Sequence, residues 1–175
     1  EIRPRDWSSD VCSSDLSPSF FASTSILIIG GLLAVLGTAD KAAELARELP
    51  FAAQTSDLVF DLKVVLLTAI FVYAFFRFTW SIRQYSFGAL LLAAAPQFDE
   101  GWTEPERQAF ADRAGGIMGQ AAESFNDGLR AYYMAFAAVA WFVSPWAFPV
   151  GTAAVVAILY RREFHSDVLH LLAQP

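Results

Sequence analysis

Apolar residues in this chain gather in long runs that polar segments separate. The first run, Phe20–Gly37, contains no charged residue, and as an α-helix it measures about 27 Å, close to the thickness of a hydrocarbon core. The second run, Leu58–Phe76, carries Asp61 and Lys63 in its first turns, where we expect both side chains to snorkel to the membrane interface. Both runs predict membrane-spanning helices.

The helical pattern of the second run continues without a helix breaker as far as Pro96. We therefore expect one long helix that leaves the membrane near residues 77–83, where aromatic side chains gather as they do at membrane interfaces. Thr103 and Glu106 then have the spacing of a capping box, which predicts the start of the next helix. Residues 77–124 are predicted to form a cytoplasmic helical segment.

Two further apolar runs lie nearer the C-terminus. They predict spans at 125–143 and 146–160, which a break at Ser144–Pro145 separates. Residues 165–175 read as an amphipathic cytoplasmic tail. The predicted fold over residues 17–164 is an all-α, polytopic transmembrane helical bundle of about four crossings, with long helices that extend into the cytoplasm.

The distribution of lysine and arginine predicts the orientation of the bundle. Arginines are frequent between the second and third predicted spans, and Arg161 and Arg162 follow the last one. The first polar loop carries only Lys41 and Arg47. The positive-inside rule then places the middle segment and the C-terminus in the cytoplasm, and the break at Ser144–Pro145 outside.

Composition agrees with a membrane protein and excludes one class of partner. The chain is 55% hydrophobic and 17% charged, whereas soluble domains contain about 25% charged residues. A net charge of −6 leaves no basic stripe that would neutralise phosphates, so we expect no nucleic-acid partner.

Residues 1–16 have the character of a foreign leader. Reverse translation of "DWSSDVCSSDL" gives a nucleotide sequence that looks like a widely used sequencing adapter, so we expect the native fragment to begin at about Leu16 or Ser17 and further native residues to precede it. Cys12, the only cysteine, then carries no information on redox compartment.

Four segments carry a resemblance to a known family: "FFASTSILIIGGLLAVLG", "DLKVVLLTAIFVYAFFRFTWSIRQYSF", "FNDGLRAYYMAFAAVAWFVSPW" and "LYRREF". Together they spread from the start of the native part to about Phe164. In these segments the chain resembles the uncharacterised bacterial membrane family known as domain of unknown function 599. The resemblance implies a polytopic inner-membrane protein, and it carries over no catalytic or binding residue.

The candidate ligand-binding residues are Arg77, Trp80, Arg83, Gln84, Asn126, Arg130 and Tyr133. The last three are spaced i, i+4, i+7 and share a helix face, and Trp80, Arg83 and Gln84 are spaced i, i+3, i+4. Two arginines that face one pocket can hold a phosphate or a carboxylate, such as a lipid head group or an anionic solute. The alternative, which is the commoner case, is that these residues only anchor the helices at the interface.

Catalytic and metal-binding patterns are missing from the sequence. It contains no Gly-rich phosphate loop, HExxH motif or nucleophile elbow, and His165 and His170 lack the spacing of a helical metal pair. We expect no metal, no cofactor and no enzymatic activity. The sequence favours a membrane protein that binds lipid, supports an assembly or docks a partner. The alternative is a small transporter or channel subunit for an anionic solute, which would act as a homo-oligomer.

Overall fold

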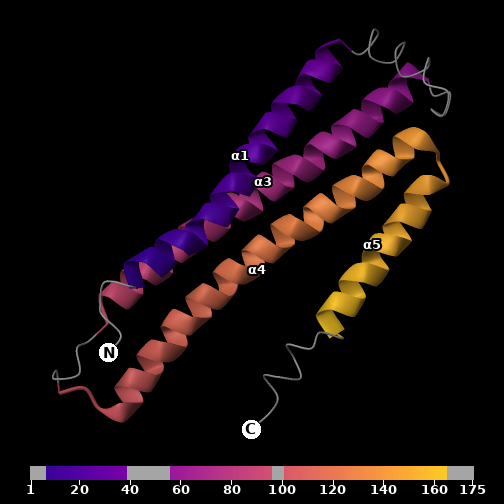
Figure 1. Cartoon of the computed structure of the whole chain (residues 1–175). Helices are drawn as coiled ribbons and strands as arrows, with labels where there is room; N and C mark the ends of the chain where they lie inside the picture. Colours follow the sequence, from indigo (N-terminus) through magenta and orange to yellow (C-terminus); the bar gives the residue numbers. More distant parts are fainter. Residues whose placement is uncertain (1–6, 39–55, 96–100, 165–175) are drawn as a thin grey trace. The chain divides into compact units, whose positions relative to one another are not determined.

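The structure, a computed structural model, describes residues 7–38, 56–95 and 101–164. Within these ranges it contains four α-helices and no strand, as Figure 1 shows. The helices are α1 (Trp7–Gly37), α3 (Asp57–Ala93), α4 (Glu104–Val143) and α5 (Ala147–Phe164). The predicted all-α fold is confirmed, whereas the predicted tail at 165–175 lies outside the described residues.

The long helix predicted from the second apolar run is confirmed as α3. Its 37 residues measure about 55 Å, well beyond the roughly 30 Å of a hydrocarbon core. It ends at Ala93, shortly before Pro96, because a proline disfavours helical geometry in the residue that precedes it. α4 ends at Val143 for the same kind of reason, since Pro145 follows two residues later.

The predicted capping residues mark the start of α4. The Glu106 carboxylate accepts hydrogen bonds from the backbone N–H and the hydroxyl of Thr103, each over 2.8 Å. These two donors stabilise the charged carboxylate and lower the pKa of Glu106 below its ordinary value. The carboxylate half of the capping box is therefore present, while the threonine hydroxyl donates to Glu106.

The helices contribute to two compact units. Unit 1 contains α1 up to Leu27, α3 from Val72 onward, and α4 up to Leu129. Unit 2 contains the remainder of α1, α3 up to Phe71, and α4 from Arg130 onward together with α5. Each unit has packing of its own.

Phe78 is the centre of unit 1. Its ring is completely buried and lies 5.3 Å from the ring of Phe21 on α1 and 5.6 Å from the ring of Phe125 on α4. Gly128 makes room for it, since a Cβ at that position would lie 2.5 Å from a carbon of the Phe78 ring. Gly88 admits Met118 from the facing helix in the same way.

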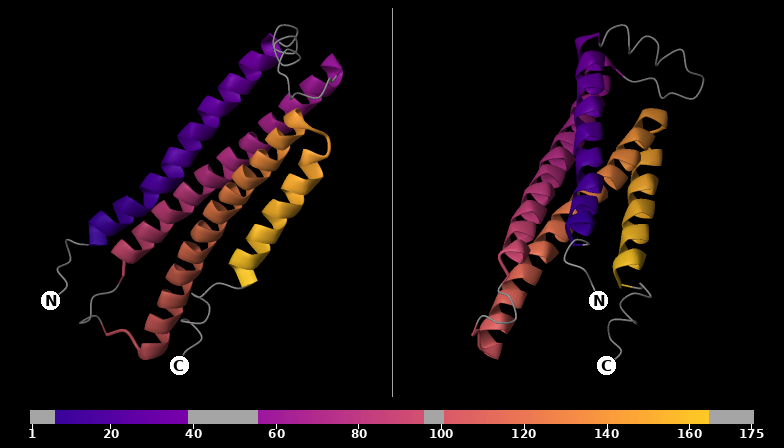
Figure 2. Two further views of the ribbon diagram at one scale, coloured as in Figure 1. Left: turned by 45° about the vertical axis from the view of Figure 1, so that its right-hand side comes forward. Right: turned by 60° about the vertical axis from the view of Figure 1, so that its left-hand side comes forward.

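Unit 2 has a small apolar core. Leu67 and Phe71 of α3 pack against Ala135 and Ala138 of α4, and partly buried side chains of α1 and α5 surround them. α5 turns back along the end of α4, as the views of Figure 2 show. The two helices come close at Gly151, where an added Cβ would lie 3.6 Å from the Ala137 Cα of α4.

Small residues occupy most of the buried positions, and large apolar residues occupy the surface. The buried hydrophobic set is mainly alanine, accompanied by Ser25, Ser81 and Ser124. By contrast, Leu27 is 76% exposed and Ile158 63% exposed. This distribution is typical of helices whose surroundings are lipid, where close approach of backbones replaces the hydrophobic effect as the driving force for packing.

Two helical segments are long and apolar enough to cross a membrane. The most apolar 18-residue stretch has a mean hydropathy of 2.1 in Leu16–Gly37 and of 2.2 in Asp57–Ala93. Only 11% and 33% of their most apolar stretches are buried, whereas the core helix of a soluble protein is mostly buried. Within the described residues α4 and α5 do not reach the same standard of length and composition.

Candidate functional site

A line of polar contacts joins α3 to α4 within unit 1. We call it the polar seam, and its members are Arg77, Ser81, Gln84, Gln120, Ser124 and Asp127. Arg77 forms an ion pair with Asp127, and the two side chains are 28% and 25% exposed. The Arg77 Nε atom is buried and has no hydrogen-bond partner among the described residues. Because Asp127 neutralises its charge, Arg77 already has an anionic partner.

The rest of the polar seam consists of neutral hydrogen bonds. The buried hydroxyl of Ser81 donates to the Ala121 carbonyl over 2.8 Å. The Gln84 amide accepts from the Ser124 hydroxyl over 2.8 Å and donates to the Gln120 side chain over 3.3 Å. Hydrogen bonds between helices hold two packed helices in one register, because sliding would leave buried polar groups unsatisfied.

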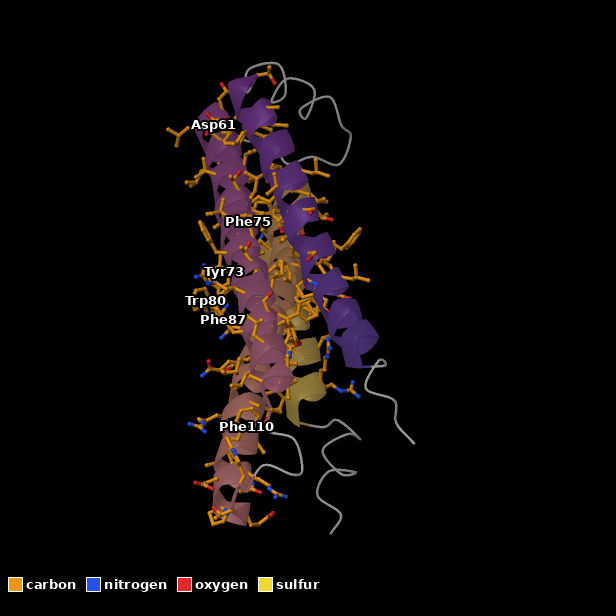
Figure 3. All side chains as sticks on the ribbon, turned by 90° about the vertical axis from the view of Figure 1, so that its left-hand side faces the viewer. Asp61, Tyr73, Phe75, Trp80, Phe87 and Phe110 are labelled. Atoms are coloured by element: carbon orange, nitrogen blue, oxygen red, sulfur yellow. The ribbon has the colours of Figure 1, made fainter. Side chains whose placement is uncertain are left out.

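Trp80 and Arg83 lie outside the polar seam. Trp80 is 53% exposed, and in Figure 3 it projects to the same side of α3 as Tyr73 and Phe87. Arg83 is exposed, and its guanidinium carbon lies 5.5 Å from the centre of the Phe87 ring, within range of a cation–π contact. Consecutive helical residues differ by about 100°, so Arg83 lies on the outer face while Gln84 reaches α4. The predicted set on α3 is thus divided between two environments.

The predicted residues on α4 are also divided. Asn126 is exposed and belongs to unit 1, whereas Arg130 and Tyr133 are half-buried and belong to unit 2. In unit 2 the Arg162 guanidinium of α5 donates to the Tyr133 hydroxyl over 3.3 Å. Tyr133 therefore has a basic neighbour that the predicted set does not include.

Comparison of the chain with protein-family profiles assigns it to a family. The family profile described as "Protein of unknown function, DUF599" matches residues 11–168, which is most of the chain. The chain belongs to the DUF599 family. The resemblance expected from the four apolar and aromatic segments is thus confirmed. No curated protein and no solved structure matches this DUF599 chain.

One intrahelical hydrogen bond of the DUF599 chain is missing at the end of α4, and α3 replaces it. Pro145 has no N–H and cannot donate to the Trp141 carbonyl, its helical partner four residues earlier. The Lys63 ammonium donates to this carbonyl over 3.1 Å and lies 5.4 Å from the centre of the Trp141 ring. Lys63 is 3% exposed, so the expectation that it snorkels to the interface is wrong. Lys63 thus supplies the hydrogen-bond donor that the C-terminal end of α4 lacks.

Asp61 differs from Lys63 in its surroundings. One carboxylate oxygen of Asp61 is buried without a hydrogen-bond partner among the described residues. Figure 3 places Asp61 near the start of α3. In the described part of the DUF599 chain no three His, Cys, Asp or Glu side chains are grouped closely enough to hold a metal ion. His165 and His170 lie outside the described residues.

Sequence reasoning missed most members of the polar seam. Arg77, Ser81 and Gln84 are spaced i, i+4, i+7, as are Gln120, Ser124 and Asp127, and this matched pattern on two helices was the signal available. Arg162 had a weaker signal, since basic residues are common in the last turn of a helix for electrostatic reasons alone.

Proposed function

We propose that this DUF599 chain is an integral, multi-pass membrane protein with a non-catalytic function, in which it binds membrane lipid and offers helical surfaces for assembly or partner docking. The observation that carries the proposal is the exposure of large apolar side chains around a core of small residues. Burying one such side chain in apolar surroundings stabilises a protein by about 1.5–3 kcal/mol. The described residues expose 22 of them, a surface that hydrocarbon accommodates and water does not.

We further propose four crossings in a bacterial inner membrane, with the C-terminus in the cytoplasm. α1 and α3 supply the two most apolar crossings. The end of α4 exposes Phe136, Val139 and Val143, and α5 exposes Val150 and other apolar side chains, which supports a lipid-facing position for both. α5 measures about 27 Å, enough to cross a hydrocarbon core with little tilt.

Membrane insertion and topology are tested together with single cysteines in a Cys12→Ala background. Trp146→Cys, at an 81% exposed position between α4 and α5, should react with a membrane-impermeant maleimide in intact spheroplasts. Ala111→Cys, exposed on α4, should react only after lysis. Labelling of both positions from the same side would overturn the four-crossing topology. Release of the protein by alkaline carbonate would overturn membrane insertion itself.

The polar seam supports a second function, a subunit of an oligomeric transporter or channel for an anionic solute. Charged residues inside a membrane segment are expensive and commonly serve ion pathways, and Arg77 lies in an apolar helix with a half-buried carboxylate partner. Anion flux through proteoliposomes, lost in Arg77→Gln, would favour this function. Absence of flux at a protein density that gives lipid binding would exclude it.

A further inference from the structure

We propose that unit 1 carries two surfaces that bind each other between neighbouring copies of this chain, with α3 of one copy packed against α4 of the next. The α3 stripe consists of Trp80, Arg83, Phe87 and Leu90, and the α4 stripe of Asn126, Glu123, Gly119 and Gly115. The inference rests on the proposed membrane insertion, because copies that insert with the same orientation keep equivalent residues at the same height. It names the partner and the interface of the proposed assembly.

The α3 stripe exposes apolar side chains at a level where the chain is too charged for hydrocarbon. Phe87 is 50% and Leu90 68% exposed, and Figure 3 shows Trp80 and Phe87 on the same side of α3. The first half of α4 lies beside them, since a Cβ on Gly88 would meet the Met118 side chain. That half carries the charged residues Glu104, Glu106, Arg107, Asp112, Arg113, Glu123 and Asp127. Hydrocarbon disfavours these charges and water disfavours the apolar stripe, so a protein surface is the suitable cover.

The α4 stripe has room for large side chains. Gly115 and Gly119 are exposed, and a Cβ at either position would meet no atom within 4 Å. Packing within the described chain therefore does not require glycine at these two positions, in contrast to Gly128, although glycine is a poor helix former. Two glycines spaced i, i+4 provide a flat face that another helix can approach closely.

Contacts within unit 1 place Arg83 and Glu123 at the same height. Gln84 forms hydrogen bonds with Gln120 and Ser124, and these three residues neighbour Arg83 and Glu123 in the sequence. Both side chains are exposed, and neither has an ion-pair partner among the residues that the structure describes. The guanidinium of one copy can therefore meet the carboxylate of the next.

The next two layers bring large side chains against glycines. Gly88 lies against Met118, so Phe87 and Gly119, which neighbour them in the sequence, share a height. The last members of the two stripes lie three and four residues further along, or about 4.5 and 6 Å, and form the layer after that. Because α3 and α4 run in opposite directions, the two stripes match in this order throughout.

The first layer joins Trp80 to Asn126. Arg77 pairs with Asp127, and Trp80 and Asn126 follow within one turn of these two residues, in the direction of the stripes. Both side chains are exposed. The indole N–H of Trp80 can donate to the amide oxygen of Asn126 in the neighbouring copy.

Polar groups beside the α3 stripe do not oppose its burial. Thr79 and Ser86 are exposed on α3 next to the stripe. The Thr79 hydroxyl donates to the Phe75 carbonyl over 2.7 Å, and the Ser86 hydroxyl donates to the Ile82 carbonyl over 3.0 Å. Both hydroxyl donors keep these partners when another helix covers them, so burial leaves no donor unsatisfied.

Charge selects the α4 stripe of a second copy as the occupant. Contact between the two stripes brings Arg83 against Glu123, whereas contact of the α3 stripe with itself would bring two Arg83 side chains together. An interface between two different surfaces is head-to-tail, and it closes into a ring where the rotation between neighbours allows.

The test uses pairs of full-length chains in a Cys12→Ala background, co-expressed in membranes, each with one cysteine and its own tag. Arg83→Cys is paired with Glu123→Cys and, as the matched control, with Arg113→Cys. Arg113 is exposed on the same helix but lies ten residues away, or about 15 Å, whereas a disulfide requires Cα atoms within about 7 Å. Oxidation with copper phenanthroline and a non-reducing gel measure the mixed dimers.

We expect Arg83→Cys to form mixed dimers with Glu123→Cys about tenfold more efficiently than with Arg113→Cys. Equal yields of the two mixed dimers would overturn the interface. Homodimers of Arg83→Cys in excess of both would also overturn it, because α3 would then pack on α3. Products that contain only another protein would assign the α3 stripe to a different partner, and no product at all would refute the assembly.

Charge reversal tests the central layer. Arg83→Glu and Glu123→Arg should each weaken association about tenfold, because each brings like charges together, and the double variant should restore it. Native mass spectrometry in detergent measures the fraction of oligomer, with Arg113→Glu as the control that leaves it unchanged. Loss of association without rescue, at a helix content that circular dichroism finds unchanged, would overturn the pairing of Arg83 with Glu123.

Two measurements keep the outcome decisive. The cysteine pairs reverse no charge, so they test the interface even if a charge-reversal variant fails to fold. Carbonate extraction separates the interface from the membrane function on which it rests. A wild-type chain that carbonate releases would refute membrane insertion, whereas a retained chain that forms no mixed dimers would refute only the interface.

Discussion

Substituting Gly128 by alanine should destabilise the chain, although alanine is the better helix former. A Cβ at this position would lie 2.5, 2.7 and 2.8 Å from three carbons of the Phe78 ring, and favourable contacts between carbons begin at about 3.5 Å. The ring cannot swing aside, because Phe21 stacks on it at 5.3 Å and Phe125 packs on it at 5.6 Å. The added methyl therefore has to displace a helix or distort a buried ring.

Two opposing effects determine the size of the change. Replacing glycine by alanine inside a helix stabilises it by about 1 kcal/mol. Overpacking a filled core costs about 1–3 kcal/mol. Gly116, on the same helix, is exposed, and a Cβ there would meet no atom within 4 Å. Gly116→Ala therefore gains the first effect alone, and Gly128→Ala should be less stable than Gly116→Ala by about 1–3 kcal/mol.

Equilibrium unfolding of the two variants in mixed micelles, followed by circular dichroism, gives this difference directly. The double variant Phe78→Leu with Gly128→Ala should be less destabilised than the sum of its single changes, because a smaller side chain makes room for the methyl group. If Gly128→Ala and Gly116→Ala stabilise the chain equally, the close packing of Phe78 on Gly128 does not exist.

Three further predictions concern polar groups. Lys63→Met should destabilise the chain by about 1–3 kcal/mol, because a carbonyl of α4 loses its hydrogen-bond donor. The loss of stability should be smaller in a Pro145→Ala background, where residue 145 regains an N–H. Equal losses in the two backgrounds, measured by unfolding experiments, would exclude the contact between Lys63 and this carbonyl. Arg77→Leu and Asp127→Leu should each lower the stability more than the double change does, because each leaves one half-buried charge unpaired. If the stability losses of the two single variants add up to the loss of the double variant, the ion pair is contradicted. The charged Glu106 side chain should stabilise the start of α4 fully above its ordinary pKa of 4.5, and this stabilisation should be lost as the pH falls through the lowered pKa of the folded state. Hydrogen exchange in the first turn of α4 should therefore depend on pH in the wild-type chain and should lose this dependence in Glu106→Gln.

Features that depend on neighbouring residues in the sequence were predictable. The continuity of α3 followed from the lack of a breaker before Pro96, and the start of α4 followed from the spacing of Thr103 and Glu106. The break after Val143 followed from the proline two residues later.

Contacts between helices were not predictable, because they depend on the register in which two helices pack. Arg77 and Asp127 are 50 residues apart, and no local pattern assigns one to the other. Trp80 and Gln84 have the spacing of one face, yet a rotation of about 40° is enough to separate an exposed side chain from one that reaches α4. The environment of Lys63 required both the packing of α3 on α4 and the missing N–H of Pro145.

The contact between Lys63 and the Trp141 carbonyl also has a consequence for biosynthesis. The donor and the acceptor are 78 residues apart, and the donor lies nearer the N-terminus. A ribosome therefore completes the helix that carries the ammonium group before it makes the carbonyl that needs it. In the natural order of synthesis the turn into α5 can form against a partner that is already present, whereas a circular permutant with α3 after α5 would expose that carbonyl until translation ends.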